Sequence, residues 1–227
     1  MVILDCNMKK LRLLFAAIFC IGLNFIQAQT IKDIDGNIYN PIKIGNQIWL
    51  IENLKTTRYS NGDTIPNVKD TIEWHILQTG AYANYNNSDS LVNKYGRLYN
   101  WPVVNDPKGL APKGWHVASR KEWEELIDTL GGLEEAKNKL MESTWWTSED
   151  LLPSKSCGFN ALPGGFRSSE TGARYGAIGN TAYWWTSTLD EQWPSDPISI
   201  TIGSYNSVEI GSDIRRYGHS VRCIKDK

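Results

Sequence analysis

Cysteine is scarce in this chain. Four of the 227 residues are cysteines, and two of these lie within the first 28 residues. Only Cys157 and Cys223 remain beyond that segment. Two thiols in an exported chain can pair. The sequence leaves this pairing open, because it does not show whether the two Cα atoms lie within about 7 Å of each other.

Clusters of positive charge are also missing. Residues 1–28 hold three of the 24 basic residues and one of the 25 acidic ones, so the remainder carries 21 basic and 24 acidic residues, a net charge of −3. No basic run survives in that remainder. Nucleic-acid binding needs a basic surface to meet the phosphates, so we expect no nucleic-acid partner.

No apolar run reaches the roughly 20 residues that a membrane-spanning helix needs. Residues 13–26 are apolar apart from one glycine and one asparagine, and they follow a basic start and precede the small residue Ala28. This order is typical of a secretory signal. We expect residues 1–28 to be a cleaved signal peptide, with no spanning segment afterwards. The protein would then be exported to the periplasm, the outer surface or the medium.

Catalytic motifs are missing as well. His75, His116 and His219 lack the spacing of metal ligands, and there is no Gly-x-Ser-x-Gly elbow. We interpret His116 as a structural, hydrogen-bonded histidine. The glycines at 164–165 and 172–179 lack the order of a phosphate-binding loop. We interpret them as tight turns, where glycine supplies positive φ angles.

A calcium motif begins near the N-terminus but is not completed. Asp33, Asp35 and Asn37 alternate as in the start of an EF-hand loop, but Ile44 occupies the position of the closing carboxylate. The sequence therefore predicts a solvated turn here and no cofactor. Calcium bound by other loop oxygens is left open, without a motif to support it.

Tryptophan, in contrast, is abundant. All ten tryptophans lie beyond residue 28, whereas Phe159 and Phe166 are the only phenylalanines there. An indole combines a large apolar face with an N–H that needs a partner, so it suits irregular cores and binding surfaces. Burial is the usual fate of a large aromatic side chain, and we expect most of these to hold the core.

Helix signals are confined to the middle of the chain. Ser119 and Glu122 form a capping box, an apolar face recurs at helical spacing after them, and Gly131 ends the helix. A second, shorter helix is predicted at 133–142. Its inward-facing residues are expected to be Leu133, Ala136 and Leu140.

Short β-prone runs occupy both ends. Turn residues separate them at Asp35-Gly36 and Gly45-Asn46. The predicted strands are 30–33, 37–44, 47–51, 182–186, 198–202, 207–211 and 219–224. Residues 55–93 are polar and rich in turn signals, and we expect a long ordered loop there with one short helix.

A set of motifs follows in a fixed order along the chain. They are Asp-Gly-Asn at 35–37, Ile-Gly-Asn-Gln-Ile-Trp at 44–49, Glu-Asn-Leu at 52–54, Tyr-Gly-Arg-Leu-Tyr-Asn-Trp at 95–101, Leu-Ala-Pro-Lys-Gly-Trp-His-Val at 110–117, Glu-Trp at 122–123, the glycine-rich run 158–167, Tyr-Trp-Trp-Thr-Ser-Thr at 183–188 and Ser-Val-Arg-Cys at 220–223. Their order resembles the Fibrobacter succinogenes major paralogous domain family. The resemblance covers residues 33–226.

The resemblance implies a single α+β domain over residues 29–227, C-type-lectin-like, with two short helices, antiparallel strands and long ordered loops. The segment 115–123 and the Arg222-Cys223 ending are similar to the sulfatase-modifying, formylglycine-generating branch of that fold. Two features of those relatives are not matched: the calcium-binding triplets of the sugar-binding lectins and the paired catalytic cysteines of the enzymes. Such folds host binding modules, invasion proteins and enzymes alike.

Five residues form the candidate ligand site. Loop-rich folds place their segments near one another, and aromatic faces beside an arginine can hold a sugar ring or a peptide. They are Phe166, Arg167, Tyr183, Trp184 and Trp185. Neighbouring strand residues point to opposite faces, so we expect one of the two tryptophans to be buried and the other to line a surface cleft.

The sequence thus favours an exported or cell-surface binding or structural module, not an enzyme. Its partner would be a glycan or a surface protein. Two alternatives stay open. One is an enzyme of the formylglycine-generating type, which needs Cys157 and Cys223 within bonding reach at an open pocket. The other is an adhesive structural protein without a small-ligand site.

Overall fold

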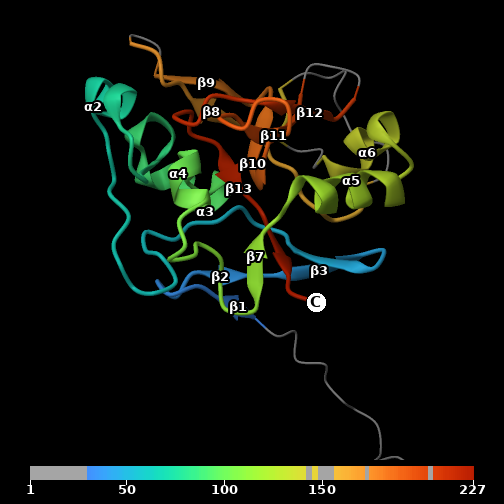
Figure 1. The fold of residues 1–227 in the computed structure, drawn as a ribbon. Helices are drawn as coiled ribbons and strands as arrows, with labels where there is room; N and C mark the ends of the chain where they lie inside the picture. Colours follow the sequence, from blue (N-terminus) through green and yellow to red (C-terminus); the bar gives the residue numbers. More distant parts are fainter. Residues whose placement is uncertain (1–29, 142–144, 148–155, 172–173, 204–206) are drawn as a thin grey trace, which may run out of the picture.

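The computed structural model describes residues 30–141, 145–147, 156–171, 174–203 and 207–227. In these ranges the chain is a mixed α/β protein of short, mainly antiparallel strands, a few short helices and long connections (Figure 1). The predicted α+β character is confirmed at this level. The expected signal peptide lies outside the described residues. Within the described ranges, no helix is long and apolar enough to cross a membrane.

The predicted N-terminal strands are present as β1 (Ile31–Lys32), β2 (Ile38–Tyr39), β3 (Pro41–Ile44) and β4 (Gln47–Leu50). The expected single meander was wrong, because the strand predicted at 37–44 is divided at Asn40 and the pairs β1-β2 and β3-β4 belong to different sheets. The turn between β3 and β4 needs glycine at position 45. Gly45 has a φ of 58°, and a Cβ there would lie 2.8 Å from the Cγ2 atom of Thr129. Positive φ and lack of space therefore both favour glycine over any other residue.

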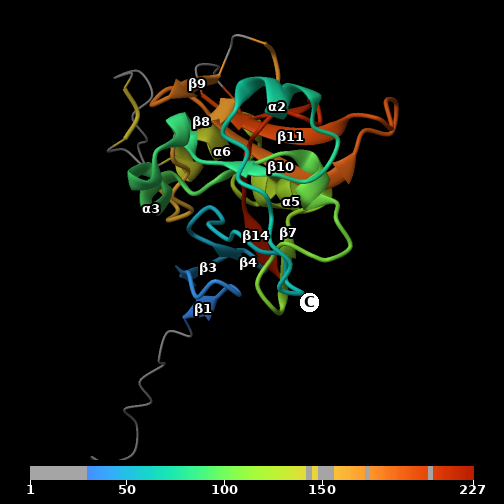
Figure 2. The same cartoon turned by 90° about the vertical axis from the view of Figure 1, so that its left-hand side faces the viewer.

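Both ends of the domain meet in one sheet. Strand β14 (Cys223–Lys225) lies between β4 and β7 (Trp115–Val117), and the strand order is β3-β4-β14-β7. All three pairings are antiparallel, and Ile224 is opposite both Trp49 and His116. Figure 2 shows this sheet below the main sheet. It ties the start, the middle and the end of the chain together.

The middle of the chain holds more structure than the predicted loop with one helix. Its elements are α2 (Thr71–Ile76), β5 (Tyr82–Ala83), the 3-10 turns Tyr85–Asn87 and Asp89–Leu91, α3 (Val92–Tyr95), β6 (Leu98–Tyr99) and α4 (Trp101–Val104). The carboxylate of Asp70 caps α2 by accepting from the N–H groups of Ile72 and Glu73. Elements of two to six residues are too short to show a hydrophobic period, which is why the sequence did not predict them.

The two predicted helices are confirmed as α5 (Arg120–Thr129) and α6 (Leu133–Leu140). The capping box at Ser119 and Glu122 is formed, because each side chain accepts from the other residue's N–H. Ala136 and Leu140 are buried as expected. The inward placement of Leu133 was wrong: its side chain is 46% exposed. It begins the helix at the margin of the core, where its carbonyl accepts from the N–H of Val208.

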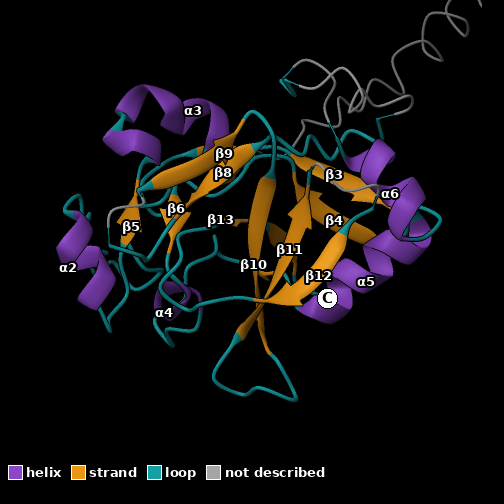
Figure 3. Cartoon of the chain, turned by 90° about the horizontal axis from the view of Figure 1, so that it is seen from above, coloured by secondary structure: helices purple, strands orange, loops and turns teal. Residues whose placement is uncertain are grey.

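The main sheet has the order β12-β11-β10-β8-β9, with β13 paired to β10 (Figure 3). Its strands are β8 (Gly164–Arg167), β9 (Tyr175–Ile178), β10 (Ala182–Leu189), β11 (Pro197–Ile202), β12 (Glu209–Ser212) and β13 (Ser220–Val221). The strands predicted in this half are confirmed, although the last one is split in two at Arg222. Helices α2, α3 and α4 lie on one side of the sheet and α5 and α6 on the other (Figures 1 and 3).

The interpretation of the glycine clusters as tight turns was wrong for Gly164, Gly165 and Gly176, which lie in the antiparallel hairpin of β8 and β9. It is confirmed for Gly179, which has a φ of 82° in the turn after β9, whereas Gly172 lies outside the described residues. A Cβ on Gly165 would lie 2.2 Å from the carbonyl oxygen of Gly176. Glycine is therefore required here because the backbones of β8 and β9 approach each other closely and leave no room for a side chain. The sequence cannot distinguish this use from a turn.

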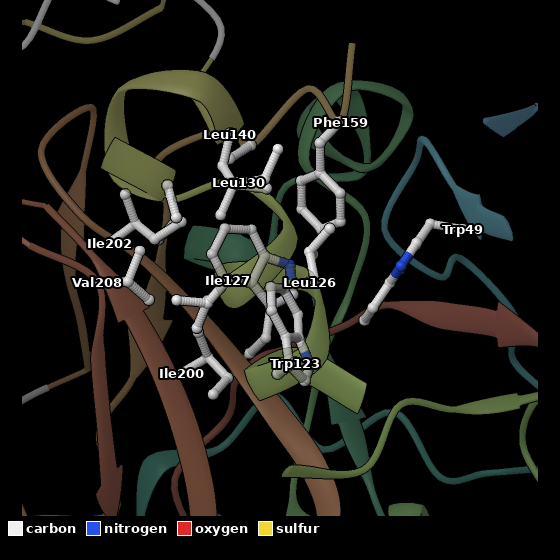
Figure 4. Close-up of a cluster of buried hydrophobic side chains, with 14 of the residues drawn as sticks. Trp49, Trp123, Leu126, Ile127, Leu130, Leu140, Phe159, Ile200, Ile202 and Val208 are labelled. Atoms are coloured by element: carbon white, nitrogen blue, oxygen red, sulfur yellow. The ribbon is translucent and has the colours of Figure 1, made fainter. Parts of the chain in front are cut away.

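Strand β10 divides the core. Trp184 packs against Trp123 on the side of α5 and α6, with ring centroids 5.6 Å apart, while Trp185 packs on the opposite side. Figure 4 shows Trp123 among the aliphatic side chains of α5, α6 and β11. Eight of the ten tryptophans are buried, which confirms that indoles chiefly fill the interior.

Candidate ligand-binding site

Two of the predicted site residues meet at the surface of the main sheet. Phe166 lies on β8 and Tyr183 on the neighbouring β10, whose pairing places Ala182 opposite Gly165. The two rings pack edge to face with centroids 5.2 Å apart. Both side chains are half-buried. The structure thus places this pair where a ligand can contact it.

The two tryptophans of β10 do not line the site. They point to opposite faces of the strand as predicted, but both are completely buried. The Nε1–H of Trp184 donates to Oδ1 of Asn53 and that of Trp185 to the carbonyl of Tyr99, each at 2.8 Å. The expectation of one exposed indole was wrong because core packs on both faces of this strand. Alternation along one strand does not reveal what covers each face.

Arg167 is also structural, which corrects its assignment as a ligand-binding fork. It is buried, and its guanidinium donates to the carbonyls of Val68, Lys69 and Asp70. The group lies over the Trp74 ring, 4.1 Å from its centroid. Burial lowers the pKa of this guanidinium. Arg167 faces away from Phe166, as neighbouring strand residues do, and anchors the segment that leads into α2.

Two further rings complete an aromatic patch, which we define as Phe166, Tyr183, Tyr217 and His219. The Tyr217 ring lies 5.9 Å from that of Phe166. The His219 ring stacks on Tyr183 at 5.2 Å with an interplanar angle of 14°. His219 is buried, while the other three side chains are half-buried. The patch therefore has a buried floor and a partly exposed rim.

A carboxylate orients the buried histidine. Nε2 of His219 lies 2.8 Å from Oδ2 of Asp213, and the ring packs 4.2 Å from that of Trp185. Nδ1 is buried and has no hydrogen-bond partner among the described residues. Buried polar atoms without a partner are uncommon in folded proteins.

A shallow depression of about 600 Å³ lies along β11 and the edge strand β12, and its residue Asp213 connects it to His219 of the patch. Tyr183, Thr201 and Glu209 are paired directly across β10, β11 and β12, so their side chains share one face of the sheet. The polar lining consists of Ser199, Thr201, Ser207, Glu209, Ser212 and Asp213. Patch and depression together offer aromatic faces, hydroxyl groups and carboxylates to one ligand.

The two cysteines lie apart from this surface as free thiols, so the bridge that the sequence left open is not formed. Burial raises the pKa of Cys223 and, although its side chain is only half-buried, also that of Cys157. A reactive cysteine needs an accessible thiolate. Neither thiol has that environment.

No group of three or more His, Cys, Asp or Glu side chains in the described ranges could hold a metal ion. The alternating acidic segment is a turn, as the sequence indicated. Oδ1 of Asp33 accepts from the N–H groups of Asp35 and Asn37, and Oδ2 accepts from the hydroxyl of Tyr39 at 2.7 Å. Asp33 itself is buried and stabilises the turn from inside.

His116 is hydrogen-bonded, as predicted, between two carboxylates. Nε2 lies 2.8 Å from Oε1 of Glu122 and Nδ1 lies 2.7 Å from Oδ1 of Asp226. Burial lowers the pKa of His116, but its hydrogen bonds to Asp226 and Glu122 together outweigh that effect and raise the pKa above 6.5. Through these two hydrogen bonds, His116 links Glu122 at the start of α5 to Asp226 near the C-terminus.

We expect His116 to stabilise the protein more at about pH 5.5 than at about pH 8.5. Its pKa is raised by folding, so the stabilisation is fully present below the unfolded-state value and is lost as the pH rises through the folded-state value. The imidazole is partly exposed, which limits the effect to less than about 1 kcal/mol. Urea unfolding of the wild type and of His116→Gln at both pH values measures it. If the unfolding free energies of the wild type and His116→Gln differ by the same amount at both pH values, the expectation is contradicted.

Sequence reasoning missed Tyr217, Asp213 and the depression. Asp213 and Tyr217 lie in the connection between β12 and β13, which has no hydrophobic period. The only local signal for Tyr217 was its position two residues before His219. Such a spacing of aromatic residues is too common in proteins to indicate a binding site. The depression depends on strand order, which no local pattern determines.

Fold and site together define a strand-rich, mixed α/β domain with a partly exposed aromatic surface. The family model described as Fibrobacter succinogenes major domain matches residues 42–225. The chain therefore belongs to this family, as its motifs indicated. No curated protein and no solved structure matches it significantly.

Proposed function

We propose that the protein is an exported or cell-surface binding module that holds a carbohydrate, or a surface protein, at the aromatic patch and the adjoining depression. One observation carries the proposal. The rings of Phe166, Tyr183 and Tyr217 are left half-buried beside a polar depression, in a chain that buries most of its tryptophans. A sugar presents an apolar ring face and a rim of hydroxyl groups, which match aromatic faces and polar side chains.

A C-type-lectin-like fold belongs to this proposal. Its support is the pair of adjacent helices α5 and α6, the mainly antiparallel strands and the long irregular connections. These are the features that the family resemblance implies. The proposal assigns no cofactor, and calcium bound by loop oxygens is a variable of the binding experiments.

The two alternative functions have less support. A formylglycine-generating enzyme needs its two cysteines close together at an open pocket. Cys223 is fully buried in one hydrophobic cluster, and Cys157 packs against another. A purely adhesive protein predicts a flat surface, and the depression beside the aromatic patch counts against it.

We expect Tyr183→Ala and Phe166→Ala to weaken ligand binding at least about tenfold, which corresponds to about 1.4 kcal/mol. Each change removes an aromatic face from the rim of the patch. Ligands are first identified on a glycan array and in pull-downs of surface proteins, and affinities are then measured by calorimetry. Calcium is both added and chelated.

Trp193→Ala is the matched control, because this indole is 59% exposed in the connection between β10 and β11. Its affinity should equal that of the wild type. Thermal unfolding confirms that each variant is folded. If no glycan or surface protein binds, or if the patch variants bind normally, the proposed function is wrong.

A further inference from the structure

The lining of the depression carries negative charge. Glu209 and Asp213 are the charged side chains among its described residues, and no lysine or arginine lines it. Glu209 is exposed on the edge strand. The Asp213 carboxylate keeps 21% of its side-chain surface exposed while it binds His219 and accepts from the N–H of Ile214. A bound ligand therefore meets carboxylates that a positive group can neutralise.

The same negative field reaches the aromatic patch. Burial raises the pKa of Tyr217, and the negative charges of Glu170 and Asp213 raise it further. Two arginines precede Tyr217 in the chain. Arg215 donates to the carbonyls of Ser195 and Pro194, whereas Nε of Arg216 is buried without a hydrogen-bond partner among the described residues.

Aromatic faces attract cations as well, because the ring quadrupole is negative above the plane. The chain already uses this attraction: Arg167 lies over Trp74 and Arg222 over Phe159. Within the described ranges, the cation–π contacts of the chain leave out the rings of Phe166 and Tyr217. The aromatic rings and the carboxylates on this surface thus both favour a positively charged ligand.

Tyr183, Thr201 and Glu209 form a row across three neighbouring strands, and the length of this row limits the size of a ligand that contacts both of its ends. Tyr183 and Glu209 are separated by one strand, with Thr201 between them. Neighbouring strands lie about 4.8 Å apart, so the row spans about 10 Å. This distance suits two linked sugar rings, one on the aromatic face and one beside the carboxylate.

We propose that the site selects oligosaccharides whose sugars carry a free, protonated amine. One ring stacks on Tyr183 and Phe166, and the ammonium group of the next lies against Glu209, while Asp213 adds negative charge to the same lining. Sugars with an acetylated amine lack the charge, and acidic sugars are repelled. This inference rests on the proposed carbohydrate binding.

Calorimetry with three tetrasaccharides tests the inference: a glucosamine oligomer with free amines, its N-acetylated form and a neutral glucan. At about pH 5.5 the amines are protonated. We expect the free-amine oligomer to bind at least about tenfold tighter than the other two. The preference should shrink at high salt, because exposed charges are then screened.

Glu209→Gln should reduce this preference about fivefold. Asp128→Asn, which removes an exposed carboxylate from α5, is the matched control and should leave it unchanged. If the acetylated or neutral oligomer binds as tightly, or if Glu209→Gln has no effect, the inference is overturned while carbohydrate binding stands. If no oligosaccharide binds and none is found on the array, both the inference and carbohydrate binding are overturned.

Discussion

Replacing Arg222 with alanine is expected to lower the free energy of unfolding by about 3–5 kcal/mol. The side chain is completely buried, and its guanidinium donates to four acceptors. They are Oδ1 of Asn53 at 3.0 Å and the carbonyls of Leu50 at 3.1 Å, Phe159 at 2.7 Å and Asn160 at 3.4 Å. These acceptors come from two segments about 100 residues apart in the sequence, so one side chain holds distant segments together.

The size of the effect follows from the environment of the charge. Burial lowers the pKa of the Arg222 guanidinium to about 9, which leaves it protonated at neutral pH. Backbone carbonyls and the Phe159 ring, 4.3 Å away, surround the charge. Alanine would leave these acceptors buried without donors and would open a cavity.

Urea unfolding measures the loss. Arg222→Lys should recover little of it, because a single ammonium group cannot reproduce the planar fork of donors. Arg120→Ala is the control: this arginine forms an exposed pair with Glu124, and its loss should cost less than about 1 kcal/mol. An Arg222→Ala variant with the wild-type unfolding midpoint would contradict the prediction.

Trp184→Ala is expected to cost about 3–5 kcal/mol as well. The indole is completely buried and packs against Trp123 and Phe159, with ring centroids 5.6 Å and 6.4 Å away. Alanine would leave a large cavity between the sheet and the helices. It would also remove the donor to Asn53, whose Oδ1 accepts from both Trp184 and Arg222.

Three comparisons separate these contributions. Trp184→Phe keeps most of the packing but loses the N–H, and should cost about 1–2 kcal/mol. Trp193→Ala removes an exposed indole and should change stability by less than about 0.5 kcal/mol. The double variant of Trp184 and Arg222 should lose more than the sum of the single variants, because only the double variant leaves Oδ1 of Asn53 without either donor. Strict additivity would show that this shared hydrogen bond contributes nothing.

The candidate site illustrates how far local patterns reach. Phe166 and Tyr183 were predicted together and lie together, although the sequence indicated a turn, not a strand, at the glycines that precede Phe166. Arg167, Trp184 and Trp185 were assigned to the same site and proved to be interior residues. Their chemistry suits binding and burial equally, and only their neighbours decide between the two roles.

Local interactions account for what the sequence determined by itself. The capping box at Ser119, the turn at Gly45 and the alternation of Trp184 and Trp185 depend on residues close in the chain, and the order of motifs along the whole chain indicates the family. The tertiary structure alone decided that β14 lies between β4 and β7, that core covers both faces of β10, and that Tyr217 and Asp213 complete the aromatic surface. These outcomes depend on contacts between residues far apart in sequence, and such contacts leave no periodic or local trace.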